Sequence, residues 1–279
     1  MLHERLLKEL RTNVSLRVET TASPDEFLVS GRGELHLAIL IENMRREQYE
    51  FQVSRPEPVT KVIDGRVYEP YERLTIDTTE EFIGDLTETM SSRRAELADM
   101  KYDGTGNVRL EYSIPTRGLI GFSSFFLRSV RGNGVENSVF TEYRLMEGEI
   151  KSDVSGVLVA SESGVAVTYG LLNAQGRGDT FIEPGTPVYK GMIVGTHPRE
   201  EDIVINVCKQ KKLTNMRSST ADITKRLSTR VKMSLDETLA FISSDELVEV
   251  TPQNIRLRKK VLSGPTRQRQ QRNIPKNKV

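Results

Sequence analysis

GRGELHLAILIENMRREQYEFQVSRPEP, residues 31–58, is the most informative stretch of this 279-residue chain. Its apolar residues have the spacing of one buried helix face: Leu37, Leu40, Ile41 and Met44. Gly31 and Gly33 bracket the turn in front, where residues without a Cβ can take positive φ at little cost. A half-buried strand follows the helix, because apolar residues alternate at Tyr49, Phe51 and Val53. The stretch therefore predicts turn, helix and strand.

Residues 1–30 add a helix and a hairpin to this stretch. Leu2, Leu6 and Leu10 lie one turn apart, and two short strands near 16–19 and 27–30 flank a Ser-Pro-Asp turn. The order α-β-β-α-β matches a ferredoxin-like unit that lacks its first strand. We therefore expect residues 1–64 to be a truncated sandwich that was cut from something longer. It should open more easily than the unit that follows.

Residues 65–145 predict a second α+β sandwich of the same plan. Strands are indicated around 74–76, 108–114 and 139–143, and residues 118–129 read as one short apolar helix. Thr78 and Glu81 have the spacing of a capping box. The helix behind them places four apolar residues on one face: Ile83, Leu86, Met90 and Leu97.

The sequence pattern changes at residue 146, and residues 146–279 predict a mostly β, barrel-like domain. Four valine-rich runs separated by turns suggest strands at 154–160, 165–172, 188–195 and 203–207. A basic loop (residues 209–232) follows, and then a short helix capped by Ser234 and Glu237. Further strands are expected at 247–250 and 255–261, and a disordered basic tail from Gly264. The predicted fold class is α+β multidomain, with two ferredoxin-like sandwiches and this third domain.

The formal charge of +1 conceals a strong asymmetry. Residues 205–279 hold 17 Lys and Arg against 6 Asp and Glu, a net charge of +11, whereas residues 1–204 have a net charge of −10. A basic C-terminal quarter of this kind indicates a nucleic-acid partner.

The sequence contains no pattern for catalysis or cofactor binding. It lacks the G-x-x-x-x-G-K-[ST] loop of nucleotide-binding proteins, and its three histidines and single Cys208 have no metal-ligand spacing. His36 is expected to be a packed or capping residue. With neither a signal peptide nor a run of eighteen apolar residues, we expect a reducing, cytoplasmic compartment and no membrane.

Two basic features favour contact with folded RNA. The basic loop has eight cations, one acidic residue (Asp222) and no aromatic residue, so phosphate and 2′-OH contacts fit better than base stacking. In the strand near 255–261, Arg256, Arg258 and Lys260 alternate with apolar residues. Steps of about 6.6 Å would give one row of cations along a phosphate backbone.

Four phrases together resemble a known family. By itself, GRGELHLAILIENMRRE resembles the third domain of the elongation factor G group of translational GTPases. Together with IPTRGLIGF (residues 114–122), KKLTNMRSS (residues 211–219) and DELVEVTPQNIRLRKK (residues 245–260), it resembles the C-terminal half of the BipA (TypA) family within that group. The alternatives are a fragment of a LepA-type GTPase and a free-standing rRNA-binding assembly factor.

The resemblance implies a ribosome-binding fragment whose GTPase domain, with GTP and Mg²⁺, lies upstream. It implies large-subunit rRNA and A-site tRNA as partners, a role in stress or low-temperature adaptation and large-subunit assembly, and a monomer. The expected RNA-binding residues combine both basic features: Lys209, Lys211, Lys212, Arg217, Lys225, Arg226, Arg230, Lys232, Arg256, Arg258, Lys259 and Lys260.

Overall fold

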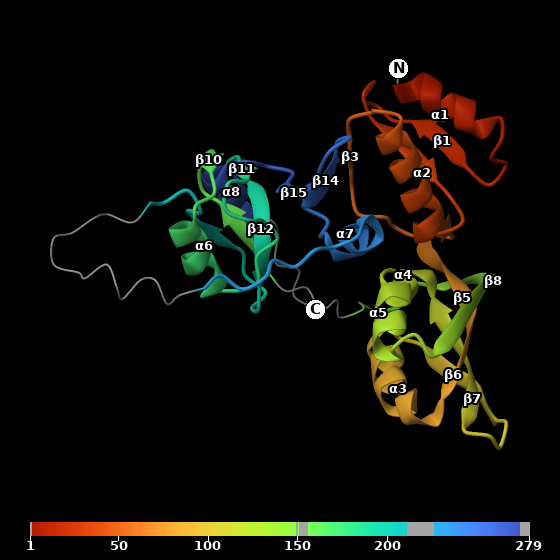
Figure 1. The fold of residues 1–279 in the computed structure, drawn as a ribbon. Coiled ribbons are helices and arrows are strands. Elements are labelled where there is room, and N and C mark those ends of the chain that lie inside the picture. The colour runs from red at the N-terminus through yellow and green to blue at the C-terminus, as the bar shows by residue number, and fades with distance from the viewer. Residues whose placement is uncertain (1, 149, 151–155, 211–225, 274–279) are drawn as a thin grey trace. The chain divides into compact units, whose positions relative to one another are not determined.

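The computed structural model describes residues 2–148, 150, 156–210 and 226–273 (Figure 1). The chain divides into two compact units. Unit 1 comprises Met1–Met44, Pro56–Ser152 and Leu239–Phe241, and unit 2 comprises Arg45–Arg55, Asp153–Thr238 and Ile242–Val279.

Unit 1 begins with two helices and a hairpin. Their bounds are α1 Leu2–Leu10, β1 Arg17–Thr20, β2 Phe27–Ser30 and α2 Glu34–Arg46. β1 and β2 pair antiparallel, from Arg17 opposite Ser30 to Thr20 opposite Phe27. The buried residues of α2 are Ala38, Leu40, Ile41 and Met44. The predicted hairpin is therefore confirmed, and so is the predicted helix face at Leu40, Ile41 and Met44, whereas Leu37 is half-buried.

The turn before α2 depends on space, not on unusual backbone angles. Neither Gly31 nor Gly33 has positive φ, so that prediction was wrong. A Cβ on Gly31 would lie 2.8 Å from Nδ1 of His36. This nitrogen accepts the Arg32 backbone N–H at 3.2 Å, and Nε2 of the same ring lies 2.8 Å from Nδ2 of Asn13. His36 is thus a capping residue, as expected.

The β1–β2 sheet has only two strands, and a two-stranded sheet is marginally stable by itself. We expect its amide protons to exchange faster than those of β5 and β7, which form the centre of the larger sheet of unit 1, by about tenfold or more. Hydrogen exchange followed by mass spectrometry measures both peptides in one experiment. Equal or greater protection of residues 17–30 would contradict this prediction.

The second part of unit 1 is a ferredoxin-like sandwich. Its elements are β4 Lys61–Ile63, β5 Arg66–Thr79, the 3₁₀ helix η1 Glu80–Phe82, α3 Ile83–Ser92, β6 Glu96–Tyr102, β7 Asn107–Pro115, α4 Thr116–Leu119, α5 Phe122–Ser129 and β8 Gly134–Leu145. β5 pairs with β7 and with β8, and β6 pairs with β7, all antiparallel. Buried side chains of α3 and α5 form one core with those of β5 and β7. Without β4, the element order is the β-α-β-β-α-β of the ferredoxin-like fold.

Three local predictions for this sandwich were wrong. Leu97 does not extend the helix: α3 ends at Ser92, and Leu97 lies exposed in the edge strand β6. Thr78 does not cap a helix, because it belongs to β5 and its hydroxyl donates to the Asn133 carbonyl at 3.1 Å. Residues 118–129 form parts of two helices, since Gly121 takes a φ of 72° between α4 and α5.

Unit 2 is built on a six-stranded sheet. Its strands and helices are β3 Phe51–Val53, β9 Gly156–Ala160, β10 Gly164–Val165, α6 Thr168–Gln175, β11 Pro187–Val188, β12 Met192–His197, β13 Ile203–Ile205, β14 Glu246–Val250, β15 Ile255–Lys259 and α8 Gly264–Asn273. Helix α7, Leu235–Phe241, begins in unit 2, and its last three residues are counted with unit 1. The strand order is β13-β9-β12-β15-β14-β3, and β10 and β11 pair separately. The sheet has two ends over the described residues, so a closed barrel is not confirmed.

Two segments of unit 2 differ from the expectation, and one matches it. A strand was expected at 165–172, but residues 168–175 form helix α6. Residues 264–273 of the supposedly disordered tail form helix α8. The capping box at α7 is confirmed, because the Ser234 and Glu237 side chains each bond the other's backbone N–H.

β3 lies in the sheet of unit 2 and not in that of its neighbours in sequence. It pairs antiparallel with β14, with Val53 opposite Val248 and Phe51 opposite Val250. The chain passes from unit 1 to unit 2 at Met44–Arg45, in the last turn of α2. Residues 51–53 therefore complete the C-terminal sheet and do not enlarge the β1–β2 sheet.

Across the described ranges, no helix combines the length and the hydropathy needed to cross a membrane.

Candidate nucleic-acid interface

Eight of the twelve expected RNA-binding residues lie in the described part of the chain. The other four fall outside it: Lys211, Lys212, Arg217 and Lys225. The structure does place both ends of the basic loop, at residues 209–210 and 226–232. Side chains at these ends are exposed at Lys209, Arg226 and Lys232.

The first end of the basic loop leaves directly from the core of unit 2. Val207 is 1% exposed, and its carbonyl accepts the Val167 backbone N–H at 3.0 Å. Gly170 of α6 faces the same backbone, and a Cβ there would overlap the Val207 carbonyl. Asn206 accepts the Cys208 N–H at 2.9 Å and donates to Glu162 at 2.7 Å. Lys209 is therefore presented from a fixed point.

The second end is fixed by the amide of Gln175. Its Oε1 accepts the Ser228 backbone N–H and its Nε2 donates to the Ser228 carbonyl, both at 2.9 Å. Three residues further on, the Val231 N–H donates to the Thr180 carbonyl at 2.9 Å. The Leu227 side chain packs against the hydrophobic core. Arg226 and Lys232 thus flank a segment that lies flat on unit 2.

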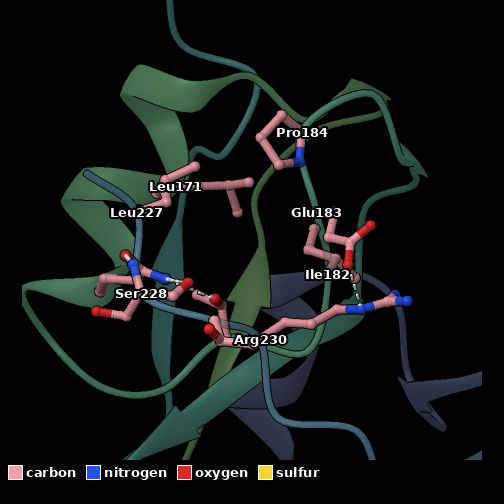
Figure 2. Close-up of a pocket in the computed structure, with 10 residues that line it drawn as sticks. Leu171, Ile182, Glu183, Pro184, Leu227, Ser228 and Arg230 are labelled. Carbon is pink, nitrogen blue, oxygen red and sulfur yellow. Dashed lines mark hydrogen bonds and ion pairs between the residues drawn. The ribbon is translucent and has the colours of Figure 1, made fainter. Parts of the chain in front are cut away.

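A pocket of about 130 Å³ lies beside this segment (Figure 2). Its lining comprises Leu171, Gln175, Thr180, Ile182, Glu183, Pro184, Leu227, Ser228, Thr229 and Arg230. Figure 2 shows the Arg230 side chain extended towards Glu183, and its Nε lies 2.7 Å from the carboxylate. Sites for small molecules usually measure about 300–1,000 Å³. The polar groups of this pocket are already paired, Gln175 with Ser228 and Arg230 with Glu183. We therefore interpret the pocket as the place where the basic loop is attached to unit 2.

The basic strand alternates as predicted, but its cations have different environments. Leu257 and Lys259 are buried, whereas Arg256 and Arg258 are half-buried on the other face of β15. Lys260 is exposed and lies just beyond the end of the strand. The row therefore has two members on the strand and a third one after it.

Arg258 is held by contacts within the protein. Its Nε donates to the Lys259 carbonyl at 3.2 Å, and its Nη1 lies 3.6 Å from Glu249. Glu249 also accepts the Tyr189 hydroxyl at 2.6 Å. Burial raises the pKa of Tyr189, and the Glu249 hydrogen bond and charge raise it further, so this tyrosine keeps its proton. A phosphate that contacts Arg258 must therefore approach a side chain that Glu249 and the Lys259 carbonyl already hold in place.

Lys259 lies in the interior, with a side chain only 3% exposed. Its Nζ contacts three carboxylates: Asp202 at 2.6 Å, Glu246 at 2.8 Å and Asp245 at 3.0 Å. Burial alone lowers the pKa of Lys259, but Glu246 and Asp202 outweigh this and raise it, so the ammonium is charged. Such a group cannot meet a phosphate, and we leave Lys259 out of the interface.

The sequence held a signal for the position of Lys259. β14 and β15 form a hairpin in which Glu246 lies directly opposite Lys259. Folding residues 245–260 about the turn at 251–254 places Asp245 and Glu246 against the two lysines of RLRKK. The sequence interpretation considered the cations without this pairing.

Comparison with known proteins finds two family models and several relatives. The family "Elongation factor G C-terminus" matches residues 66–154, and the family "TypA/BipA C-terminal domain" matches residues 155–264. Among the relatives, "Large ribosomal subunit assembly factor BipA" of Bacillus subtilis is 52% identical over 269 residues, covering 96% of this chain and 44% of the relative. The proteins of the same name from Synechocystis and Haemophilus influenzae are 51% and 50% identical, covering 92% and 96% of this chain and 43% and 44% of the relatives.

These matches place an elongation factor G C-terminal domain next to a TypA/BipA C-terminal domain. Nearly the whole chain thus aligns with part of the proteins named BipA, and the resemblance seen in the sequence motifs is confirmed. The chain spans less than half the length of these relatives.

Proposed function

We propose that this chain is the ribosome-binding part of a translational GTPase that acts in assembly of the large ribosomal subunit. The relatives' name supports this proposal, as does the net charge of +11 in residues 205–279. We further propose that it contacts large-subunit rRNA and A-site tRNA as a cytoplasmic monomer, in adaptation to stress or low temperature. The LepA-type and free-standing alternatives are not favoured, because the TypA/BipA domain model matches.

Any GTP hydrolysis belongs, in this proposal, to another part of the whole protein. No phosphate-binding loop of the P-loop type occurs in the 279 residues. The chain described here acts by binding.

One observation carries the proposal: both ends of the basic loop are fixed on unit 2, and exposed cations stand at each end. Because both ends of the loop are already fixed, ordering them costs no further conformational entropy when the loop binds. Lys and Arg side chains would meet phosphate oxygens, the Arg side chains as bidentate donors. Arg256 and Lys260 extend the same kind of surface from β15.

A salt series tests the proposal. If about six to eight cations meet phosphates, the logarithm of the rRNA affinity should fall against the logarithm of the salt concentration with a slope of roughly −4 to −7. Replacing Lys211, Lys212 and Arg217 together by Ala should flatten this slope by about two to three units. The fold should remain intact, which circular dichroism measures.

A second triple variant tests the strand: Arg256→Ala, Arg258→Ala and Lys260→Ala. It should flatten the slope in the same way, with some loss of stability, because Arg258 holds Glu249 and the Lys259 carbonyl. A charge-matched control replaces three exposed cations of unit 1, Lys8, Arg11 and Arg66, by Gln. Wild-type slopes in both well-folded test variants would refute the proposed contact surface.

A further inference from the structure

Helix α8 has the composition of a segment that cannot stabilise itself by packing. Its ten residues, GPTRQRQQRN, include three arginines and neither an acidic nor an apolar aliphatic or aromatic residue. A helix that is polar on all sides has no face to bury. Isolated helices shorter than about 12–15 residues are marginal in water.

The start of α8 is nevertheless attached to the sheet of unit 2. The Arg267 N–H donates to the Ser263 carbonyl at 3.0 Å. The Arg267 guanidinium donates to the Val261 carbonyl at 2.8 Å and to the Leu262 carbonyl at 3.1 Å. These carbonyls follow directly on β15, so Arg267 fixes the first turn of α8 next to the end of the basic strand.

The cations beyond this anchor are open to solvent where the structure describes them. Arg269 is exposed, and so is Lys260 before the helix. The sequence contributes Arg272 in the last turn of α8. From residue 250 to the end of the chain there are nine basic residues and no acidic one. This segment therefore contains no carboxylate side chain that would weaken its attraction for an anion.

We propose that α8 is an RNA-binding helix whose helical form is stabilised by the phosphates of folded RNA. This inference rests on the function proposed above, and it adds a contact element separate from the basic loop and from β15. Arginine-rich segments commonly fold on binding RNA, and phosphates spaced along a strand supply the counter-charge that such a helix lacks. Arg267 fixes the first turn of the helix, and the exposed Arg269 meets a phosphate.

The test uses the full chain with purified large-subunit rRNA. The variant Arg269→Gln should flatten the salt slope by about 0.9 units, since each lost duplex phosphate contact accounts for about 0.9. Arg269→Lys keeps the charge and should keep the slope. In hydrogen exchange, rRNA should protect residues 264–273 of the wild type at least tenfold.

Two further arms identify the partner. Polyglutamate and anionic lipid vesicles carry negative charge without an RNA backbone, and neither should protect residues 264–273. Protection by either of them at the level given by rRNA would overturn the assignment to RNA.

The outcomes separate this inference from the proposed function. If the wild type binds rRNA with a steep salt slope but the Gln variant keeps that slope, and residues 264–273 gain no protection, the role of α8 is refuted and the basic loop stands. If the wild type shows no salt-dependent rRNA affinity, the proposed function fails, and this inference fails with it.

Discussion

Replacing Lys259 by Met should lower the free energy of unfolding of unit 2 by about 3–5 kcal/mol, because it leaves the buried carboxylate of Glu246 without its counter-charge. Glu246 is 1% exposed, and its carboxylate forms an ion pair with Nζ of Lys259 at 2.8 Å. Lys260→Met is the matched control: this neighbour is exposed, and its loss should stay within about 0.5 kcal/mol. Denaturant unfolding, followed by a probe in unit 2, measures both variants.

The pH dependence of the Lys259→Met variant gives an independent check. Burial raises the pKa of Glu246. Removing the lysine takes away the main group that lowers this pKa. A carboxyl whose pKa is higher in the folded than in the unfolded state binds protons on folding, so stability rises as the pH falls. The variant should therefore lose less stability at pH 5 than at pH 7.5, and adding Glu246→Gln should restore part of it at pH 7.5. An equal loss at both pH values would count against this account.

The second large effect is expected in β3. The double variant Phe51→Ala/Val53→Ala should destabilise unit 2 by about 2–4 kcal/mol, from two half-buried side chains and their cross-strand pairs. Both residues lie opposite fully buried valines, Val250 and Val248, which would lose their cover. Gln52 between them is exposed, and Gln52→Ala should change little.

Hydrogen exchange locates this effect. Residues 246–250 and 255–259 should lose protection in the double variant, whereas β5 and β7 of unit 1 should not. A synthetic peptide covering residues 45–55 should restore part of the lost protection if the strand itself is what the sheet needs. Unchanged protection of β14 would show that β3 is dispensable.

Periodicity was sufficient for α2 and β7, which each bury one regular face. Leu40, Ile41 and Met44 marked α2, and the alternation of Val108, Leu110, Tyr112 and Ile114 marked β7, which the structure confirms. The Ser234–Glu237 capping box was recognisable because its chemistry is local.

The misses share a physical cause, namely that the deciding contacts are distant in sequence. β6 is almost wholly exposed, so it has no alternation to detect, and only its pairing with β7 makes it a strand. The β-branched residues at 165–168 suggested a strand, yet helix α6 forms, with Gly170 allowing its close approach to Val207. At the candidate interface, pattern alone identified the cations but could not show that Lys259 is buried.

The placement of β3 also has a consequence for folding during translation. β3 is made about 195 residues before its partner β14. At roughly 5–20 residues per second, that is a delay of about 10–40 s. For this time Phe51 and Val53 belong to a strand without its native neighbour, and the nascent chain must keep it from pairing elsewhere. This protein, whose relatives are named for ribosome assembly, can therefore complete the sheet of unit 2 only after β14 has been synthesised.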